Sequence, residues 1–86
     1  MSRILVDCSH GNSRKKAKNQ SKVVSSVLNQ IKNGNRHIMG VMLESFLHHG
    51  SQALANPLSY GVSITDECIG WEDTTEVLAM IYDQLP

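Results

Sequence analysis

The chain has 86 residues, so it is no larger than one small domain, and its eight basic side chains balance its eight acidic ones. A net charge of zero provides no field that would draw the chain to nucleic acid or to an anionic lipid surface, so we expect neither as a partner. Hydrophobic residues make up 41% of the chain, which excludes a disordered protein, and no apolar stretch approaches the ~20 residues of a membrane span.

The two cysteines, Cys8 and Cys68, lie far apart in the sequence. They form neither a CxxC motif nor a disulfide framework, so we expect a reducing, cytoplasmic location. We expect no secretory leader, because Arg3 and Asp7 flank an apolar run too short for one.

The first half of the chain predicts a strand followed by a helix. Residues 3–8 predict this strand, because Ile4, Leu5 and Val6 form an apolar run without alternation, which is typical of a strand buried on both faces of a parallel sheet. Gly11 and Asn12 mark a loop, and the basic and polar stretch of residues 15–22 predicts a loop or a frayed helical turn. Residues 21–32 then predict a helix, which Gly34 ends. Its apolar face consists of Val23, Val24, Val27, Leu28 and Ile31.

The second half repeats this order. Residues 38–43 form another apolar run of strand length, in which we expect Met39 and Met42 to fill the core. A long loop over residues 46–60 follows, and loops of this length in small chains are usually functional or disordered. Residues 75–85 predict the last helix. Its expected apolar face consists of Val77, Leu78, Ile81 and Leu85.

The resulting order is two strand–helix units, which predicts a parallel strand pair joined by a right-handed crossover. Two parallel strands cannot close a sheet, and their outer edges would expose unpaired backbone groups. The sequence therefore predicts an α/β chain that is part of a larger parallel structure rather than a complete domain.

Three polar side chains follow the predicted strands on the same side of the sheet. His10 follows the first strand, Glu44 follows the second, and Asp66 comes from the loop beyond. Because adjacent parallel strands lie ~4.8 Å apart, these side chains can meet at one point. An imidazole and two carboxylates suit a divalent transition metal such as Mn²⁺, Fe²⁺, Co²⁺ or Zn²⁺. The alternative is a capping histidine, a surface glutamate and a helix N-cap aspartate.

Asp7 stands three residues before His10. Its carboxylate can orient the His10 ring or bind a metal through water, because carboxylates often fix a metal-bound imidazole. An ordinary aspartate at the end of a strand is the alternative interpretation.

Three long motifs occur in one order along the chain: VDCSHGNS at residues 6–13, GVMLES at residues 40–45 and YGVSITDECIGWEDT at residues 60–74. In this order the sequence resembles the carboxyl-terminal region of class I 3-deoxy-D-arabino-heptulosonate 7-phosphate (DAHP) synthases, also called phospho-2-dehydro-3-deoxyheptonate aldolases. The likeness covers essentially residues 1–86. It implies the last two βα units of a (β/α)8 TIM barrel: strand 7, helix 7, strand 8, a loop and helix 8.

The resemblance also implies a function. The family condenses phosphoenolpyruvate with erythrose 4-phosphate and releases phosphate, a transferase reaction that is the first step of the shikimate pathway of aromatic amino acid biosynthesis. The family's divalent metal is held by one Cys, one His, one Glu and one Asp. By motif match His10, Glu44 and Asp66 are three of these ligands and act in catalysis through the metal.

The resemblance leaves the rest of the site outside this chain. The family's metal-binding Cys lies near its first barrel strand, so neither Cys8 nor Cys68 takes its place. The residues that bind the substrate phosphates lie upstream as well, and we assign none of them here. We therefore expect a truncated product, an excised fragment or one piece of a split enzyme, inactive alone and needing the rest of the barrel or oligomerisation. The alternative is a stand-alone metal- or partner-binding module without catalysis.

Overall fold

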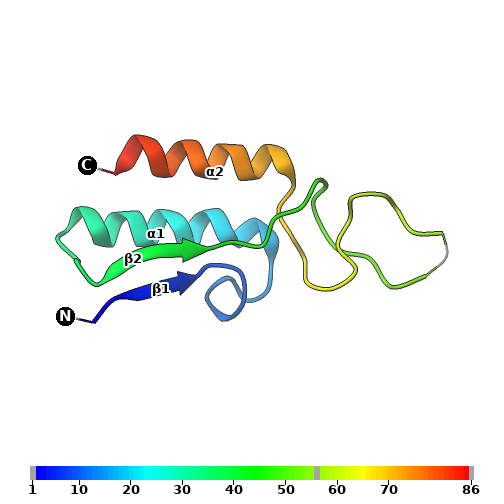
Figure 1. The fold of residues 1–86 in the computed structure, drawn as a ribbon, viewed down its shortest axis with the longest axis horizontal. Coiled ribbons are helices and arrows are strands. Elements are labelled where there is room, and N and C mark those ends of the chain that lie inside the picture. The colour runs from blue at the N-terminus through cyan, green and yellow to red at the C-terminus, as the bar shows by residue number, and fades with distance from the viewer. Residues whose placement is uncertain (1, 56, 86) are drawn as a thin grey trace.

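The computed structural model describes residues 2–55 and 57–85, and the chain forms an elongated α/β structure of 49 × 24 × 16 Å. Two short strands and two long helices alternate along the chain, with two 3-10 turns between the first strand and the first helix (Figure 1). In chain order the elements are β1 (Ile4–Asp7), η1 (Gly11–Ser13), η2 (Ala17–Asn19), α1 (Gln20–Lys32), β2 (Ile38–Met42) and α2 (Trp71–Gln84). Among the described residues, neither helix combines the length and hydrophobicity needed to cross a bilayer.

The two strands pair in parallel, as predicted. Leu5 lies opposite Gly40 and Asp7 opposite Met42, after a register irregularity between Ile4 and Leu5. A side chain at position 40 would collide with Leu5, because a Cβ built there lies 2.8 Å from Leu5 Cδ2. Gly40 thus lets the Leu5 side chain lie across the neighbouring strand.

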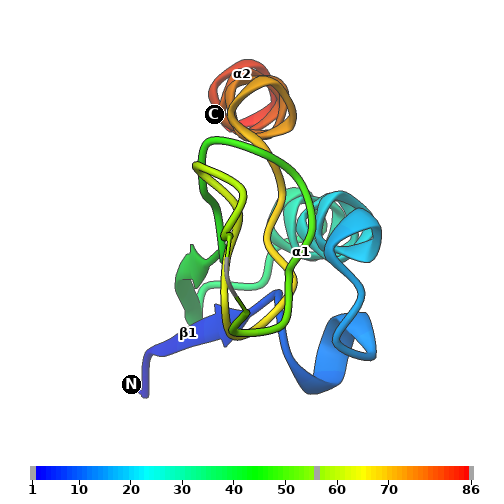
Figure 2. The same cartoon turned by 90° about the vertical axis from the view of Figure 1, so that its right-hand side faces the viewer.

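Helices α1 and α2 run side by side on one side of the strand pair (Figures 1 and 2). Helix α1 places Val24, Val27 and Leu28 in the interior, which confirms the apolar face predicted from their spacing. A core cluster lies between the helices and the ends of the strands, and burying its apolar side chains away from water stabilises the fold. Its members are Cys8, Ala17, Val24, Leu28, Ile69 and Val77.

Two predictions about the last helix were wrong. Helix α2 begins at Trp71, four residues before the predicted start. Of its predicted apolar face, Leu78 is exposed rather than buried, and Leu85 is also exposed and lies just beyond the helix end. The first turn carries Glu72 and Asp73, which lie outside the apolar pattern yet suit the positive end of the helix dipole. Thr74 stabilises this turn by donating a hydrogen bond from Oγ1 to the Gly70 carbonyl, at 2.8 Å.

The long loop after β2 extends away from the layer of helices and strands (Figure 1). It is held by short backbone pairings rather than by a core: Ser45 bridges to Ile69, Gly50 to Cys68, and Ser51 to Ser63. The prediction of a loop is confirmed, and these bridges give its two limbs a fixed register.

Methionines 39 and 42 are exposed, so the prediction that they fill the core was wrong. Val6 and Val41 pack against the core cluster, and alternation along a strand therefore turns Leu5 and Met42 to the opposite face. No helix covers that face among the described residues, and Leu5 is 64% exposed.

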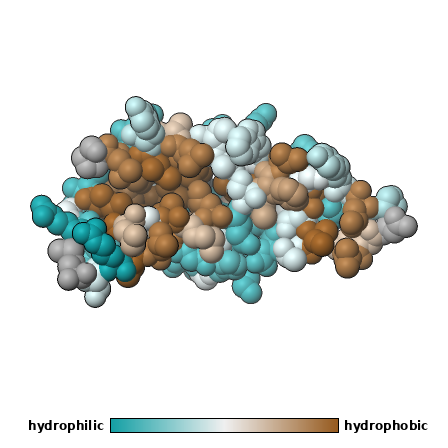
Figure 3. Space-filling view, viewed as in Figure 1, coloured by the Kyte–Doolittle hydropathy of each residue, from teal (hydrophilic) through white to brown (hydrophobic). Residues whose placement is uncertain are grey.

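An apolar groove of about 320 Å³ also lies between β2 and the two helices. Hydrophobic residues gather over this part of the molecule in Figure 3. Its lining includes Leu28, Ile31, Met39, Val41, Ile81 and Leu85. At the bare sheet face and in this groove, apolar side chains such as Leu5 and Met39 are left uncovered by the described residues.

Candidate metal centre

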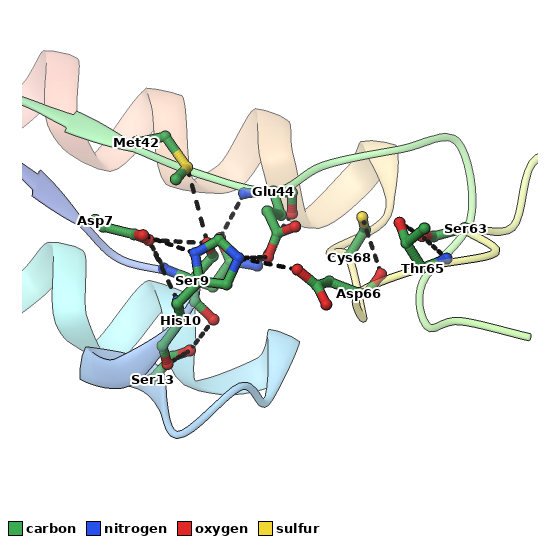
Figure 4. A network of polar contacts seen from close by, with 11 residues as sticks. Asp7, Ser9, His10, Ser13, Met42, Glu44, Ser63, Thr65, Asp66 and Cys68 are labelled. Carbon is green, nitrogen blue, oxygen red and sulfur yellow. Dashed lines mark hydrogen bonds and ion pairs between the residues drawn. The ribbon is translucent and has the colours of Figure 1, made fainter.

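The structure brings His10, Glu44 and Asp66 together beyond the carboxyl ends of β1 and β2 (Figure 4). His10 Nε2 lies 2.9 Å from Asp66 Oδ2 and 3.3 Å from Glu44 Oε1. One donor atom from each of the three residues lies within 4.8 Å of the others. The convergence predicted from strand order is therefore observed, and the role of these residues as metal ligands stays a prediction.

These donor atoms fit a divalent cation. Ligand atoms that each stand about 2.1 Å from a metal are separated by roughly 3 to 4 Å, and the contacts of His10 Nε2 are already in this range. The side chains of His10 and Glu44 are partly buried and that of Asp66 is half exposed, so the cluster remains open on one side. An imidazole with two carboxylates suits Mn²⁺, Fe²⁺, Co²⁺ or Zn²⁺.

The loop after β1 sets the direction of the His10 ring. Asp7 Oδ2 lies 2.6 Å from His10 Nδ1, while Asp7 Oδ1 accepts hydrogen bonds from the backbone and the hydroxyl of Ser9. An ionised carboxylate only accepts, so Nδ1 carries the proton and Nε2 faces the two other carboxylates. Nε2 there either bears a second proton or directs its lone pair at a cation.

The pKa values of the site follow from these contacts. The hydrogen bond from the Ser9 backbone, followed by that from His10, holds the pKa of Asp7 far below its usual range. Hydrogen bonds to Asp7 and then to Asp66 raise the pKa of His10, and the contact with His10 lowers the pKa of Asp66. In the absence of a cation, these interactions favour an imidazolium between ionised carboxylates.

Asp66 is not a helix N-cap, because α2 begins at Trp71 with Gly70 at the cap position. The residue lies instead in the loop before the helix, and its neighbour Glu67 accepts a hydrogen bond from the Ala17 backbone at 2.8 Å. The alternative interpretation of a capping aspartate is thereby excluded.

Two residues near the site were missed from the sequence. Buried Gln20 bonds to the backbone of Glu44, and Glu67 ties the Asp66 loop to the turn before α1. Their partners lie 24 and 50 positions away, so no local spacing identifies them. Cys8 and Cys68 are free and buried, and desolvation raises the pKa of both thiols.

The fold and this cluster define the class: a parallel α/β chain with a histidine–carboxylate site at the carboxyl ends of its strands. Residues 1–79 match the model of the DAHP synthetase I family, and the chain belongs to this family.

Relatives of known name support the assignment. The chain is 51% identical over 85 residues to the Tyr-sensitive phospho-2-dehydro-3-deoxyheptonate aldolase of Escherichia coli, a match that covers 95% of this chain and 24% of the relative. It is 50% identical over 82 residues to a putative aldolase of the same name from Schizosaccharomyces pombe, covering 91% of this chain and 22% of that protein. The chain thus spans about a quarter of the length of these relatives.

A solved structure shares the fold. The phospho-2-dehydro-3-deoxyheptonate aldolase of Francisella tularensis superposes with a TM-score of 0.89 at 41% identity, over 95% of this chain and 24% of the other. The arrangement of two strands and two helices is therefore one that a larger aldolase contains.

Proposed function

We propose that this chain is the metal-binding, carboxyl-terminal part of a DAHP synthase, an enzyme that joins phosphoenolpyruvate to erythrose 4-phosphate. The observation that carries the proposal is the convergence of His10, Glu44 and Asp66 in a chain of this family. A divalent cation held there supplies Lewis acidity toward the aldehyde of erythrose 4-phosphate.

The chain's own residues hold and orient the donors. His10 offers Nε2 because Asp7 keeps the proton on Nδ1, and the two carboxylates balance the charge of a divalent ion. Which of Mn²⁺, Fe²⁺, Co²⁺ or Zn²⁺ occupies the site depends on availability as well as on these donors. A fourth protein ligand and the phosphate-binding residues belong to the other three quarters of the enzyme.

The partner of this chain is the rest of the (β/α)8 barrel, supplied in the same polypeptide or as a second chain. The bare sheet face and the apolar groove support this, because both present surface that a small stable domain would bury. The same exposure argues against a stand-alone metal- or partner-binding module. The free thiols of Cys8 and Cys68 support a cytoplasmic location.

Complementation tests the proposal. The 86-residue chain is mixed with the part of the E. coli relative that precedes the matched region, in the presence of Mn²⁺, and consumption of phosphoenolpyruvate is followed. We expect activity from the mixture and none from either part alone. His10→Ala should abolish it, whereas Glu76→Gln, an exposed change on α2, should leave it intact.

Two results would count against the proposal. A mixture that forms a stoichiometric complex but has no activity would favour a partner-binding module. Activity that survives His10→Ala would remove the metal centre from the mechanism.

A further inference from the structure

The side chain of Gln20 is fully buried, with 0% of its surface exposed, although glutamine is an uncommon residue in a protein interior. It is the first residue of α1 and lies 24 positions before Glu44. Its Nε2 donates a hydrogen bond to the Glu44 carbonyl at 3.0 Å, and its Oε1 accepts one from the Glu44 N–H at 2.9 Å. The carboxamide therefore binds both backbone groups of one candidate metal ligand.

These two hydrogen bonds lie just beyond the end of β2, where strand pairing no longer supplies hydrogen bonds to the backbone. Strand β2 ends at Met42, whose carbonyl accepts the backbone N–H of Cys8 at 2.9 Å. Two residues further on, Glu44 takes its N–H bond from the side chain of Gln20 instead. The carboxamide presents one donor and one acceptor, as a peptide group of a neighbouring strand would.

The opposite side of Glu44 is held as well. Its carbonyl accepts a second hydrogen bond, from the Ile69 N–H at 3.0 Å, and Phe46 donates back to the Ile69 carbonyl at 2.9 Å. Glu44 thus lies between α1 and the segment that leads into α2. With the backbone fixed on both sides, fewer positions are open to its carboxylate.

Residues beside Gln20 reach the two other ligand segments. The Ala17 N–H donates to Glu67, the neighbour of Asp66, and Asn19 Nδ2 donates to the Ser13 carbonyl at 3.0 Å. Ser13 Oγ in turn lies within hydrogen-bond distance of the Ser9 and His10 carbonyls. The η2 turn and the first residue of α1 together therefore contact all three segments that carry the donors.

We propose that Gln20 is a positioning residue of the metal centre, whose carboxamide fixes the backbone of Glu44 so that the Glu44 carboxylate meets His10 and Asp66. This inference rests on the proposed function, since it requires that the three donors bind a metal. Loss of a residue that orients a metal ligand typically weakens metal binding about 10- to 100-fold. We expect a loss of this size when the carboxamide is removed.

The test compares Gln20→Met with Gln30→Met. Methionine keeps nearly the volume of glutamine but offers neither hydrogen bond, and Gln30 is an exposed residue of the same helix. Mn²⁺ affinity is measured by electron paramagnetic resonance of the free ion, and folding by circular dichroism without metal. The visible spectrum of bound Co²⁺ reports the geometry of its ligands.

We expect Gln20→Met to bind Mn²⁺ at least 10-fold more weakly and to alter the Co²⁺ spectrum, with Gln30→Met unchanged in both. A folded Gln20→Met variant with the wild-type affinity and spectrum would overturn the proposal and reduce Gln20 to a purely structural role. A wild-type chain that binds no Mn²⁺, either alone or mixed with the remaining part of the E. coli relative, would overturn the metal centre itself, and the role of Gln20 with it.

A second variant covers the case in which Gln20→Met does not fold. Gln20→Asn keeps the carboxamide but is one methylene too short to reach Glu44, and it leaves room for a water that can bond the freed N–H. We expect its Mn²⁺ affinity to fall as well. Wild-type affinity in Gln20→Asn would overturn the proposal.

Discussion

Asp7 Oδ2 and His10 Nδ1 are 2.6 Å apart, so the carboxylate holds the imidazole with Nε2 toward Glu44 and Asp66. Asp7 is opposite Met42 in the register of the sheet, and the loop after it is short enough to bring His10 back over the end of β1. The side chain at the end of one strand thus determines which ring atom the site presents.

Replacing Asp7 by Asn tests this relationship. The amide can donate to Nδ1, which moves the ring proton to Nε2 and blocks the atom that faces the two carboxylates. We expect Asp7→Asn to weaken Mn²⁺ binding about 10- to 100-fold, measured by titration with detection of the free ion. The exposed Asp83→Asn in α2 is the matched control, and equal affinities in the two variants would contradict the assigned role of Asp7.

Metal binding should stabilise the folded chain. A ligand that binds only the folded state at 100 times its dissociation constant raises the free energy of unfolding by about 2.7 kcal/mol. We expect Mn²⁺ to raise the urea midpoint by a corresponding amount, followed by circular dichroism because Trp71 is already 59% exposed when folded. The shift should disappear in His10→Ala and persist in His37→Ala. A shift of the same size in both variants would place the cation elsewhere.

Truncating a buried side chain should lower the stability of the chain far more than truncating an exposed one. Leu28→Ala removes a buried side chain of α1 and should cost about 2 to 5 kcal/mol of stability, enough to unfold most of a marginal chain. Leu78→Ala, at an exposed position of α2, should change stability by less than about 0.5 kcal/mol. Urea denaturation of the two variants measures the difference. Similar losses would mean that Leu78 is buried by self-association.

Much of this structure could be predicted because the local pattern and the tertiary environment agree. Helix α1 follows from the three- and four-residue spacing of its valines, and the parallel strand pair follows from two apolar runs with a helix between them. The site followed from strand order, since His10 and Glu44 come after neighbouring strands. These features depend on the spacing of apolar residues, which is visible in the sequence itself.

The remaining features depend on contacts between distant segments or on surface that this chain does not cover. Met39 was predicted to be a core residue because it is apolar and lies in a strand, yet it is 61% exposed and lines the open groove between β2 and the helices. The start of α2 was predicted too late because its first turn contains the polar residues Glu72 and Asp73, so the regular spacing of apolar residues does not extend to it. Gln20 was missed because its partner lies on a different element.

The bare sheet face leads to the last prediction. Leu5 is exposed on β1, next to a strand edge that has no partner among residues 2–55 and 57–85, and such edges invite pairing with other chains. We expect the isolated chain to self-associate at micromolar concentrations or above, and Leu5→Lys to shift it toward the monomer in sedimentation velocity. Lysine at an edge opposes association through its charge.

The matched control is Leu58→Lys in the long loop, which is exposed but away from the strands. If the wild-type chain stays monomeric, or if both substitutions act alike, the uncovered strand face is not what drives association. If Leu5→Lys also prevents complementation by the remaining part of the E. coli relative, the same surface serves both contacts.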